Sequence, residues 1–314
     1  MNAKNIIITI LVLVLAGAIG YFIINSKNEQ VAVNTVPPTT ESETTTQPEV
    51  ATTTKTEENA AVTERGDETV IGTSVNGSNI TAYHFGTGEK ELLFIGGIHG
   101  GYSWNTALVG YELVDYLDAN PNLIPADVTI TVIPVLNPDG LKATVGTTGR
   151  FSATDAIAIN ETARIAGRFN ADEVDLNRNF DCEWNETGTW QNKEVSGGSA
   201  PFSEPEASAI KAYITAHKPT AAVVWFSSEG KVYPSACGGT PSKESVTLAA
   251  TFANAAGYGA AAEFNAYNIT GDMVNWMAKQ NIPAISVLLT DYKNTEWDKN
   301  LAGVKAVINT YSQE

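Results

Sequence analysis

One histidine, two arginines and an asparagine are the residues of this sequence best suited to chemistry. His99 follows the apolar run ELLFIGG and stands beside two glycines, which leave room around its ring for a metal ion. Arg168, Asn177 and Arg178 lie in GRFNADEVDLNRNF. A guanidinium group pairs with a carboxylate through two parallel hydrogen bonds. These residue types indicate metal binding at His99 and carboxylate binding at the arginines.

Each of these residues also has a purely structural explanation. A single histidine after a strand is commonly a satisfied structural residue, and Arg178 can form an internal ion pair with Asp175 or another acid. The acids Glu204 and Glu206 are expected to support or cap a helix, because the SEPE segment begins a helix where negative charge is favourable.

The elements that must position these residues alternate between strands and helices. This alternation predicts an α/β fold in which helices cover both faces of a largely parallel, twisted sheet. The predicted strands are TVIGTSV, NITAYHF, ELLFIGG, DVTITVIPVL, AAVVWFS and AISVLL. The predicted helices cover residues 104–118, 204–217, 243–256, 271–280 and 296–309.

Several segments stand in an order that indicates one protein family. After ELLFIGG come IHGGYSWNT, VIPVLNPDG, GRFNADEVDLNRNF, PFSEPEA, and finally ITGDMVNW before IPAISVLLTDY. In this order and at these spacings they resemble the carboxypeptidase A-like zinc metallopeptidases, over nearly all of the chain after about residue 68. The resemblance implies a mixed sheet of the phosphorylase/hydrolase-like kind. Ligand sites in such sheets gather at the carboxyl ends of strands, where the unusual residues lie.

The resemblance also implies a catalytic site. Members of the family hold zinc with a histidine, a glutamate and a second histidine, and leave a fourth position for water. Zinc lowers the pKa of that water, and a further glutamate handles its proton. Groups that bind the terminal carboxylate of the substrate fall on Arg168, Asn177 and Arg178.

At the two other zinc-ligand positions the sequence departs from the family pattern. His99 matches the first ligand, but the glutamate expected three residues later is Tyr102, or Ser103 if the alignment shifts by one. The second histidine is expected in WFSSEGKVYPS, where its position falls on Phe226 or, with a similar shift, on Ser227. None of these side chains is an ordinary zinc ligand. We therefore expect His99 to be the remnant of a dismantled metal site.

The catalytic glutamate is replaced as well. The family reads Glu-Leu in the strand after the IPA turn, whereas this chain has Leu288 at the first of these positions. Leucine cannot accept a proton. A substitute site that joins His99 to Glu229 or Asp291 stays open, because both carboxylates follow strands that should end near the site.

The sequence thus predicts a zinc-carboxypeptidase-like domain that does not cut peptides. Our first hypothesis is a non-catalytic pseudopeptidase without a cofactor, which binds the C-terminal carboxylate of a peptide or of a peptidoglycan stem. Two alternatives stay open. One is an active metallocarboxypeptidase that uses zinc through unconventional ligands. The other is a tethered structural domain, in which Arg168 and Arg178 would be fully engaged inside the protein.

The first 66 residues predict a membrane tether. Residues 6–25 include IIITILVLVLAGAIGYFII, an uncharged run near the length that spans a bilayer. We expect an uncleaved signal anchor, with residues 1–5 in the cytoplasm and an extracytoplasmic domain at 67–314. Cleavage near the small residues 16–18 would instead give a secreted protein. Residues 26–66, rich in Thr, Glu and Pro, predict a disordered linker.

Charge and cysteine content restrict the partners and the compartment. Lys and Arg total 19 against 35 Asp and Glu, a formal net charge of −16. Nucleic acid is therefore a poor partner, because its binding depends on basic side chains. The two cysteines, Cys182 and Cys237, fall in the part expected to be exported, where a disulfide is permitted. Two buried thiols that never meet are the alternative.

Overall fold

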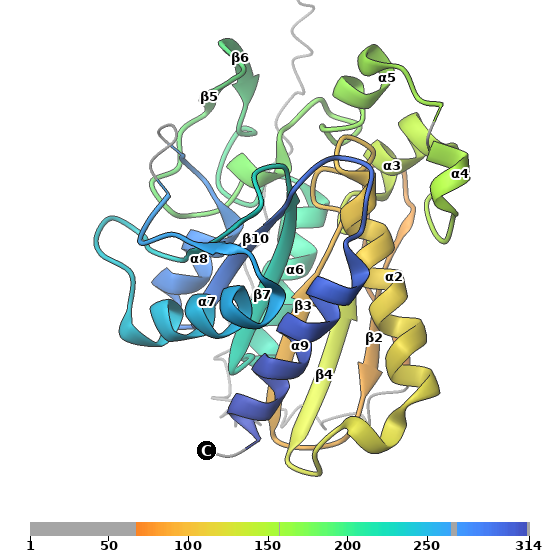
Figure 1. The fold of residues 1–314 in the computed structure, drawn as a ribbon. Helices are drawn as coiled ribbons and strands as arrows, with labels where there is room; N and C mark the ends of the chain where they lie inside the picture. The colour runs from red at the N-terminus through yellow and green to blue at the C-terminus, as the bar shows by residue number, and fades with distance from the viewer. Residues whose placement is uncertain (1–66, 157, 265–268, 313–314) are drawn as a thin grey trace, which may run out of the picture. The chain divides into compact units, whose positions relative to one another are not determined.

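The computed structural model describes residues 67–156, 158–264 and 269–312 (Figure 1). The expected cytoplasmic end, anchor and linker, residues 1–5, 6–25 and 26–66, lie outside the described residues. Within the part of the chain that is described, no helix combines the length and the apolar composition needed to cross a bilayer.

A mixed sheet forms the centre of the domain (Figure 1). Its strands are β1 (Glu68–Thr73), β2 (Asn79–Phe85), β3 (Lys90–Ile95), β4 (Val128–Ile133), β7 (Ala221–Ser227), β8 (Lys231–Pro234), β9 (Gly259–Ala260) and β10 (Ala284–Leu289). They lie in the order β1-β2-β4-β3-β7-β10-β8-β9. Neighbours are parallel from β4 through β3 and β7 to β10, and antiparallel from β1 to β4 and between β10 and β8. The predicted α/β fold with a mixed, largely parallel sheet is confirmed.

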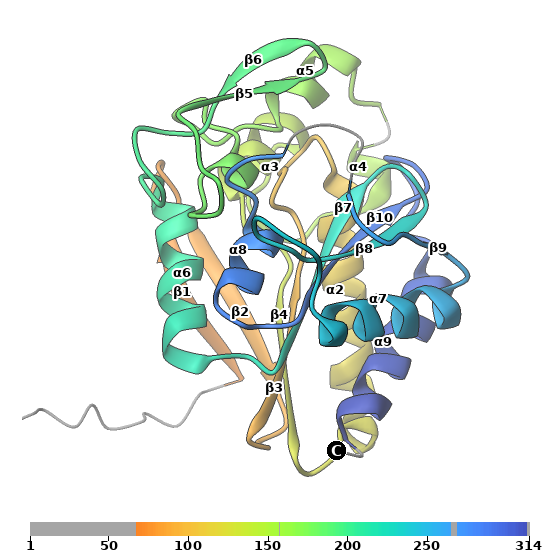
Figure 2. The ribbon, with the colours of Figure 1, turned by 90° about the vertical axis from the view of Figure 1, so that its left-hand side faces the viewer.

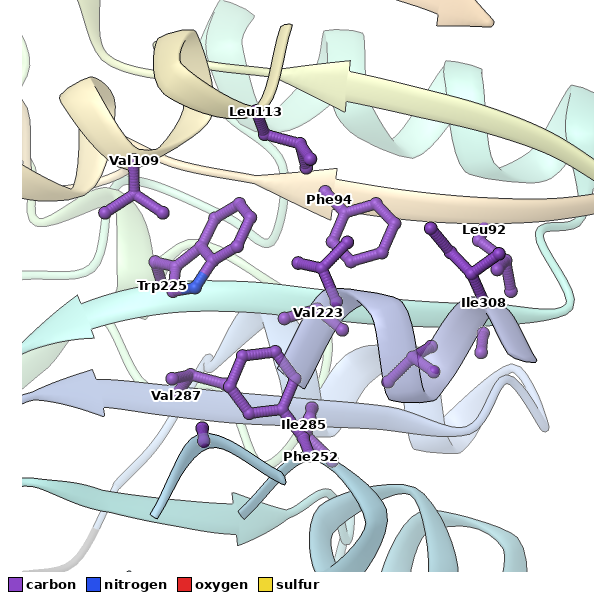
Figure 3. Close-up of a cluster of buried hydrophobic side chains, with 14 of the residues drawn as sticks. Leu92, Phe94, Val109, Leu113, Val223, Trp225, Phe252, Ile285, Val287 and Ile308 are labelled. Atoms are coloured by element: carbon purple, nitrogen blue, oxygen red, sulfur yellow. The ribbon is translucent and has the colours of Figure 1, made fainter. Parts of the chain in front are cut away.

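Helices cover both faces of this sheet, as Figure 2 shows. One face carries α2 (Trp104–Ala119), α7 (Lys243–Ala256) and α9 (Trp297–Tyr311), and the other carries α6 (Pro205–His217) and α8 (Met273–Lys279). Successive side chains of a strand point to opposite faces. Phe94 of β3 therefore lies in the hydrophobic core under α2, α7 and α9, where it stacks on Trp225 at 5.8 Å between ring centroids (Figure 3). Leu93 points the other way, into the core under α6 and α8.

The central strands have unbroken apolar runs because helices cover both faces of the sheet. Every residue of β4 is buried, and in β7 only Ser227 at the end is partly exposed. A strand with helices on both faces needs apolar side chains on both, so its sequence does not alternate.

The segments that connect these strands and helices contain smaller elements that the sequence analysis did not predict. α3 (Pro138–Val145) begins in the NPDG segment, where the side-chain oxygen of Asn137 accepts a hydrogen bond from the backbone N–H of Gly140 at 2.8 Å. The others are α4 (Ala153–Ala156), α5 (Glu161–Ala166), the 3-10 turns η1 (Pro121–Leu123) and η2 (Leu176–Arg178), and a hairpin of β5 (Thr187–Trp190) and β6 (Lys193–Ser196).

A disulfide joins Cys182, shortly after η2, to Cys237, in the loop between β8 and α7. Their Cα atoms are 5.8 Å apart. Of the two alternatives that the sequence left open, the structure shows the disulfide. It ties the segment that carries Asn177 and Arg178 to the loop after β8, a strand next to the β9 edge of the sheet.

Candidate functional site

A cavity of about 380 Å³ lies at the carboxyl ends of β3, β7 and β10, where the loops of three parallel strands meet. From the predicted positions it brings together His99, Tyr102, Arg168, Asn177, Phe226, Ser227 and Leu288. Arg178 and Ser103 are 2% and 1% exposed and do not line it. Its walls also carry residues that sequence reasoning missed, namely Trp190, Gln191, Tyr233, Phe264, Asp272 and Tyr292.

His99 is buried between a carboxylate and a guanidinium. Its Nε2 lies 3.5 Å from Oδ1 of Asp175, and its Nδ1 lies 3.4 Å from Nη1 of Arg168. Burial first, and then the charge of Arg168, lowers the pKa of His99 to about 4, against the opposing effect of Asp175. The imidazole is therefore neutral at pH 7, and one of its two nitrogens contacts a cation.

Both arginines approach Asp175, which is fully buried. Arg168 donates from Nε to Oδ2 at 3.0 Å, and its Nη2 lies 2.9 Å from the same oxygen. Nε of Arg178 is 4.0 Å from that oxygen. Burial alone would raise the pKa of Asp175, but the charge of Arg168, the interaction with the His99 ring and the charge of Arg178 outweigh it and hold that pKa below its usual value. The ion pair considered for Arg178 and Asp175 exists, but Arg168 is the closer partner.

Asn177 and Arg178 are held by the loops around them. Nδ2 of Asn177 donates to Oδ2 of Asp272 at 2.7 Å, and its Oδ1 accepts from the backbone N–H of Met273 at 3.2 Å. Nη2 of Arg178 donates to the carbonyl oxygen of Thr189 at 2.9 Å. Of the three residues predicted to bind a carboxylate, two line the cavity and Arg178 supports the β5–β6 hairpin instead.

Comparison with known proteins identifies the family. A family model described as zinc carboxypeptidase matches residues 60–300. This chain belongs to the zinc carboxypeptidase family. The resemblance inferred from the order of the sequence segments is thereby confirmed.

Individual members of the family resemble the chain only distantly. Carboxypeptidase B of Helicoverpa zea is 28% identical over 157 residues, which cover 48% of this chain and 35% of the relative. Murein-tripeptide amidase MpaA from Escherichia coli O157 is 18% identical, with a TM-score of 0.55 over 79% of this chain and 92% of that one. Carboxypeptidase A of Helicoverpa armigera is 17% identical, with a TM-score of 0.63 over 78% and 68%. These structural matches establish the zinc carboxypeptidase fold.

The side chains at the expected metal position do not fit a zinc ion. The predicted ligand positions are Tyr102 or Ser103, and Phe226 or Ser227. The ring centroids of Tyr102 and Phe226 lie 6.5 and 5.6 Å from that of His99. Burial and the hydrogen bond with Tyr292 raise the pKa of Tyr102, which keeps its phenol protonated. Across the described ranges, no three His, Cys, Asp or Glu side chains form a group that could hold a metal ion. One neutral imidazole beside a guanidinium is not a zinc site.

The substitute carboxylates are committed elsewhere. Glu229 lines the cavity, but its Oε1 accepts from Lys231 at 2.6 Å and its Oε2 from Tyr233 at 2.7 Å. Asp291 lines a different cavity and accepts hydrogen bonds from the backbone N–H groups of Lys293 and Asn294. Neither carboxylate contacts His99, so the considered substitute site is not assembled.

The most informative residues that sequence reasoning missed come from the β5–β6 hairpin. TGTW and KEVS flank a two-residue turn in which Gln191 and Asn192 have φ of 49° and 60°. A two-residue turn with positive φ between short strands is a hairpin signal. The strands are polar and only four residues long, so they lack the apolar runs by which the other strands were recognised.

We expect the buried His99 to make the domain lose stability as the pH falls from 6.5 toward 4. The unfolded chain binds a proton at His99 near pH 6.5, whereas the folded domain does so only near pH 4. Between these values the unfolded state holds more protons, so the free energy of unfolding decreases on acidification. This difference between the pKa of His99 in the unfolded and in the folded chain corresponds to about 3 kcal/mol in the free energy of unfolding. Urea unfolding at a series of pH values measures it.

The control for this pH effect is His99→Asn, because other buried groups also titrate. Glu112, Glu206 and Asp272 have raised pKa values, caused first by burial, and they oppose the histidine. The difference in the free energy of unfolding between wild type and the variant reports the contribution of His99. This difference should shrink as the pH falls. If the free energies of unfolding of the two proteins change with pH in parallel, the prediction is wrong.

Proposed function

We propose that this domain is a non-catalytic zinc carboxypeptidase homologue that binds the C-terminal carboxylate of a peptide or of a cell-wall peptide stem. The observation that carries the proposal is the pairing of two features in one cavity. Arg168 lines it, and so do Tyr102, Phe226 and Leu288, which fall at or beside the predicted ligand and general-base positions. The cavity keeps a group that holds a peptide end and lacks groups that activate water.

The chemistry of Arg168 supports this role. A guanidinium has five N–H donors. Nε donates to Asp175, Nη1 contacts His99, and Nη2 lies against Asp175, so each terminal nitrogen keeps a second N–H. A guanidinium binds both oxygens of a carboxylate through two parallel N–H groups, and in the proposed complex these would be the remaining donors of Nη1 and Nη2.

The lack of a carboxylate at the predicted general-base position supports a binding role over hydrolysis. Leu288 is partly buried in the cavity wall at the predicted general-base position. Asp272 also lines the cavity and has a raised pKa because of its burial, but both its oxygens accept hydrogen bonds, from Asn177 and from the backbone N–H of Asn275. We therefore expect bound peptide to be released intact.

The relatives support the class of ligand. Their names describe carboxypeptidases A and B and a murein-tripeptide amidase, which act on peptide ends or on cell-wall peptides. We propose that this chain binds the same class of peptide as a ligand and does not cleave it. A free carboxylate at the end of the peptide is the feature that Arg168 would recognise.

Calorimetric titration of the domain with short peptides tests the proposal. We expect the peptide acid to bind about ten to a hundred times more tightly than its C-terminal amide, because one charge-assisted interaction is lost. Arg168→Gln should remove this difference. Arg150→Gln, at an exposed arginine paired with Asp115, is the matched control and should preserve it.

Two results would overturn the proposed function. Equal affinity for acid and amide would leave only a structural role for Arg168. Release of the C-terminal residue from the peptide, dependent on added zinc and seen by mass spectrometry, would show an active metallocarboxypeptidase.

We further propose that residues 6–25 anchor the domain to a membrane and that the domain is extracytoplasmic. The support is the length of this uncharged run in the sequence. In cells that express the full chain, the protein should stay with membranes after alkaline extraction and be cleaved by external protease in the segment 26–66. Recovery of an uncleaved chain in the soluble cytoplasmic fraction would refute the proposal.

A further inference from the structure

We infer that Tyr102, at a position where the family is expected to hold a zinc ligand, positions the ligand-binding parts of the cavity in place of a metal. Its ring and hydroxyl connect Arg168, the tip of the β5–β6 hairpin and the loop after β10. The inference deepens the proposed function and rests on it, because Arg168 is the group proposed to hold the peptide carboxylate.

The ring of Tyr102 is the centre of a cluster of arginines and aromatic side chains. The guanidinium carbons of Arg164 and Arg168 lie 4.5 and 5.5 Å from its centroid. The rings of Trp190 and Tyr292 each meet it edge to face, at 5.0 Å between centroids. Tyr102 itself is 2% exposed. Cation–π and edge-to-face contacts of buried rings favour one fixed arrangement of the groups involved.

The hydroxyl of Tyr102 joins two segments that are distant in the sequence. It donates to the hydroxyl of Tyr292 at 3.0 Å, in the loop after β10, and accepts from Nε2 of Gln191 at 3.2 Å, in the hairpin turn. Both contacts depend on a phenol. A glutamate at this position would instead place a carboxylate between Arg164 and Arg168.

Tyr102 also acts on the guanidinium of Arg168 through Trp190, which contacts both side chains. Trp190 lies over Arg168, with 4.4 Å from the guanidinium carbon to the ring centroid. The hairpin therefore covers the group that we propose to bind the carboxylate, and Tyr102 holds the hairpin by both its ring and its hydroxyl. A displaced hairpin would leave Arg168 without its stacking partner.

The backbone that carries Tyr102 is itself held by close packing. A Cβ added to Gly100 would lie 2.7 Å from the carbonyl carbon of Gly140, and one added to Gly101 would lie 2.1 Å from Oγ1 of Thr144. Gly100 also has φ of +41°. The loop rests against α3 so closely that Tyr102 has a firm support from which to position its neighbours.

Hydrogen exchange without peptide gives the first test. Tyr102→Phe keeps the ring and removes both hydroxyl contacts, whereas Tyr292→Phe removes one of them from the other side. We expect exchange of residues 187–196 to become about fivefold faster in Tyr102→Phe, the effect of one or two hydrogen bonds, and to change less in Tyr292→Phe. Unchanged exchange in Tyr102→Phe would overturn the positioning role of the hydroxyl.

A peptide titration gives the second test. Tyr102→Leu removes the ring and should weaken binding of the peptide acid by about tenfold, while Tyr102→Phe should restore most of the affinity. Tyr111→Phe is the matched control, because Tyr111 also packs against an arginine, at 4.8 Å from Arg150, but lines a different cavity. Tyr111→Phe should change neither the hydrogen exchange of residues 187–196 nor the affinity for the peptide acid.

The two tests separate this inference from the proposed function. Normal peptide affinity in Tyr102→Leu, with wild type discriminating acid from amide, would overturn the inference and leave the proposed function intact. Faster exchange in the Tyr102 variants together with no acid preference in wild type would support the positioning role and defeat the peptide-binding proposal.

Discussion

Replacing Asp175 by asparagine is expected to lower the free energy of unfolding by about 3–5 kcal/mol, the cost of removing one partner of a buried ion pair. Asp175 is fully buried, accepts from Arg168 at 3.0 Å and lies 4.0 Å from Nε of Arg178. Asparagine has the same shape, so the change removes the charge and little packing. Two buried guanidinium groups then lose the carboxylate that both approach.

Urea unfolding at pH 7, followed by circular dichroism, measures this loss. The matched control is Asp181→Asn, because Asp181 also pairs with a basic residue, Lys279, at 2.9 Å, but both side chains are about half exposed. An exposed pair of this kind contributes about 1 kcal/mol or less. Equal losses in the two variants would mean that burial of Asp175 does not carry the effect.

Removal of the disulfide is expected to lower the free energy of unfolding by about 4 kcal/mol, from the chain entropy that a cross-link of this length removes from the unfolded state. The cysteines are 55 residues apart, and the closed loop contains the hairpin and α6. The variant Cys182→Ala/Cys237→Ala measures the loss in urea unfolding.

Reduction of the wild-type protein is the control for the disulfide. Cys182 is 2% exposed in an apolar core, so its replacement by alanine also removes packing. Reduction with dithiothreitol breaks only the cross-link. If reduced wild type unfolds at the same urea concentration as the oxidised protein, the cross-link does not stabilise the fold by the entropic route.

The sequence predicted the central elements of the fold closely. The helix expected at 104–118 is α2 (Trp104–Ala119), and the one expected at 243–256 is α7 with the same bounds. These elements could be predicted because burial on a helix-covered sheet imposes a strong apolar pattern. The β5–β6 hairpin has no such pattern, since Val195 is the one buried residue among the eight residues of its two strands.

The candidate site was predicted in its residue types and only partly in its contacts. The order of motifs placed His99, Phe226 and Leu288 correctly in one cavity, because each follows or ends a strand of one parallel set. The contact between Tyr102 and Tyr292 joins positions 190 residues apart. Sequence spacing carries no information on which loops touch, so the role of a tyrosine at a ligand position could not be predicted.

The contact between Arg168 and Asp175 has a consequence for where such a domain can operate. The fully buried carboxylate of Asp175 is paired with a cation that belongs to the chain, so its counter-charge does not have to be acquired from the surroundings. The fold should then be equally sound in zinc-poor and zinc-rich surroundings. Under the proposed function, we expect that reagents which bind metallopeptidases through their metal do not bind this protein.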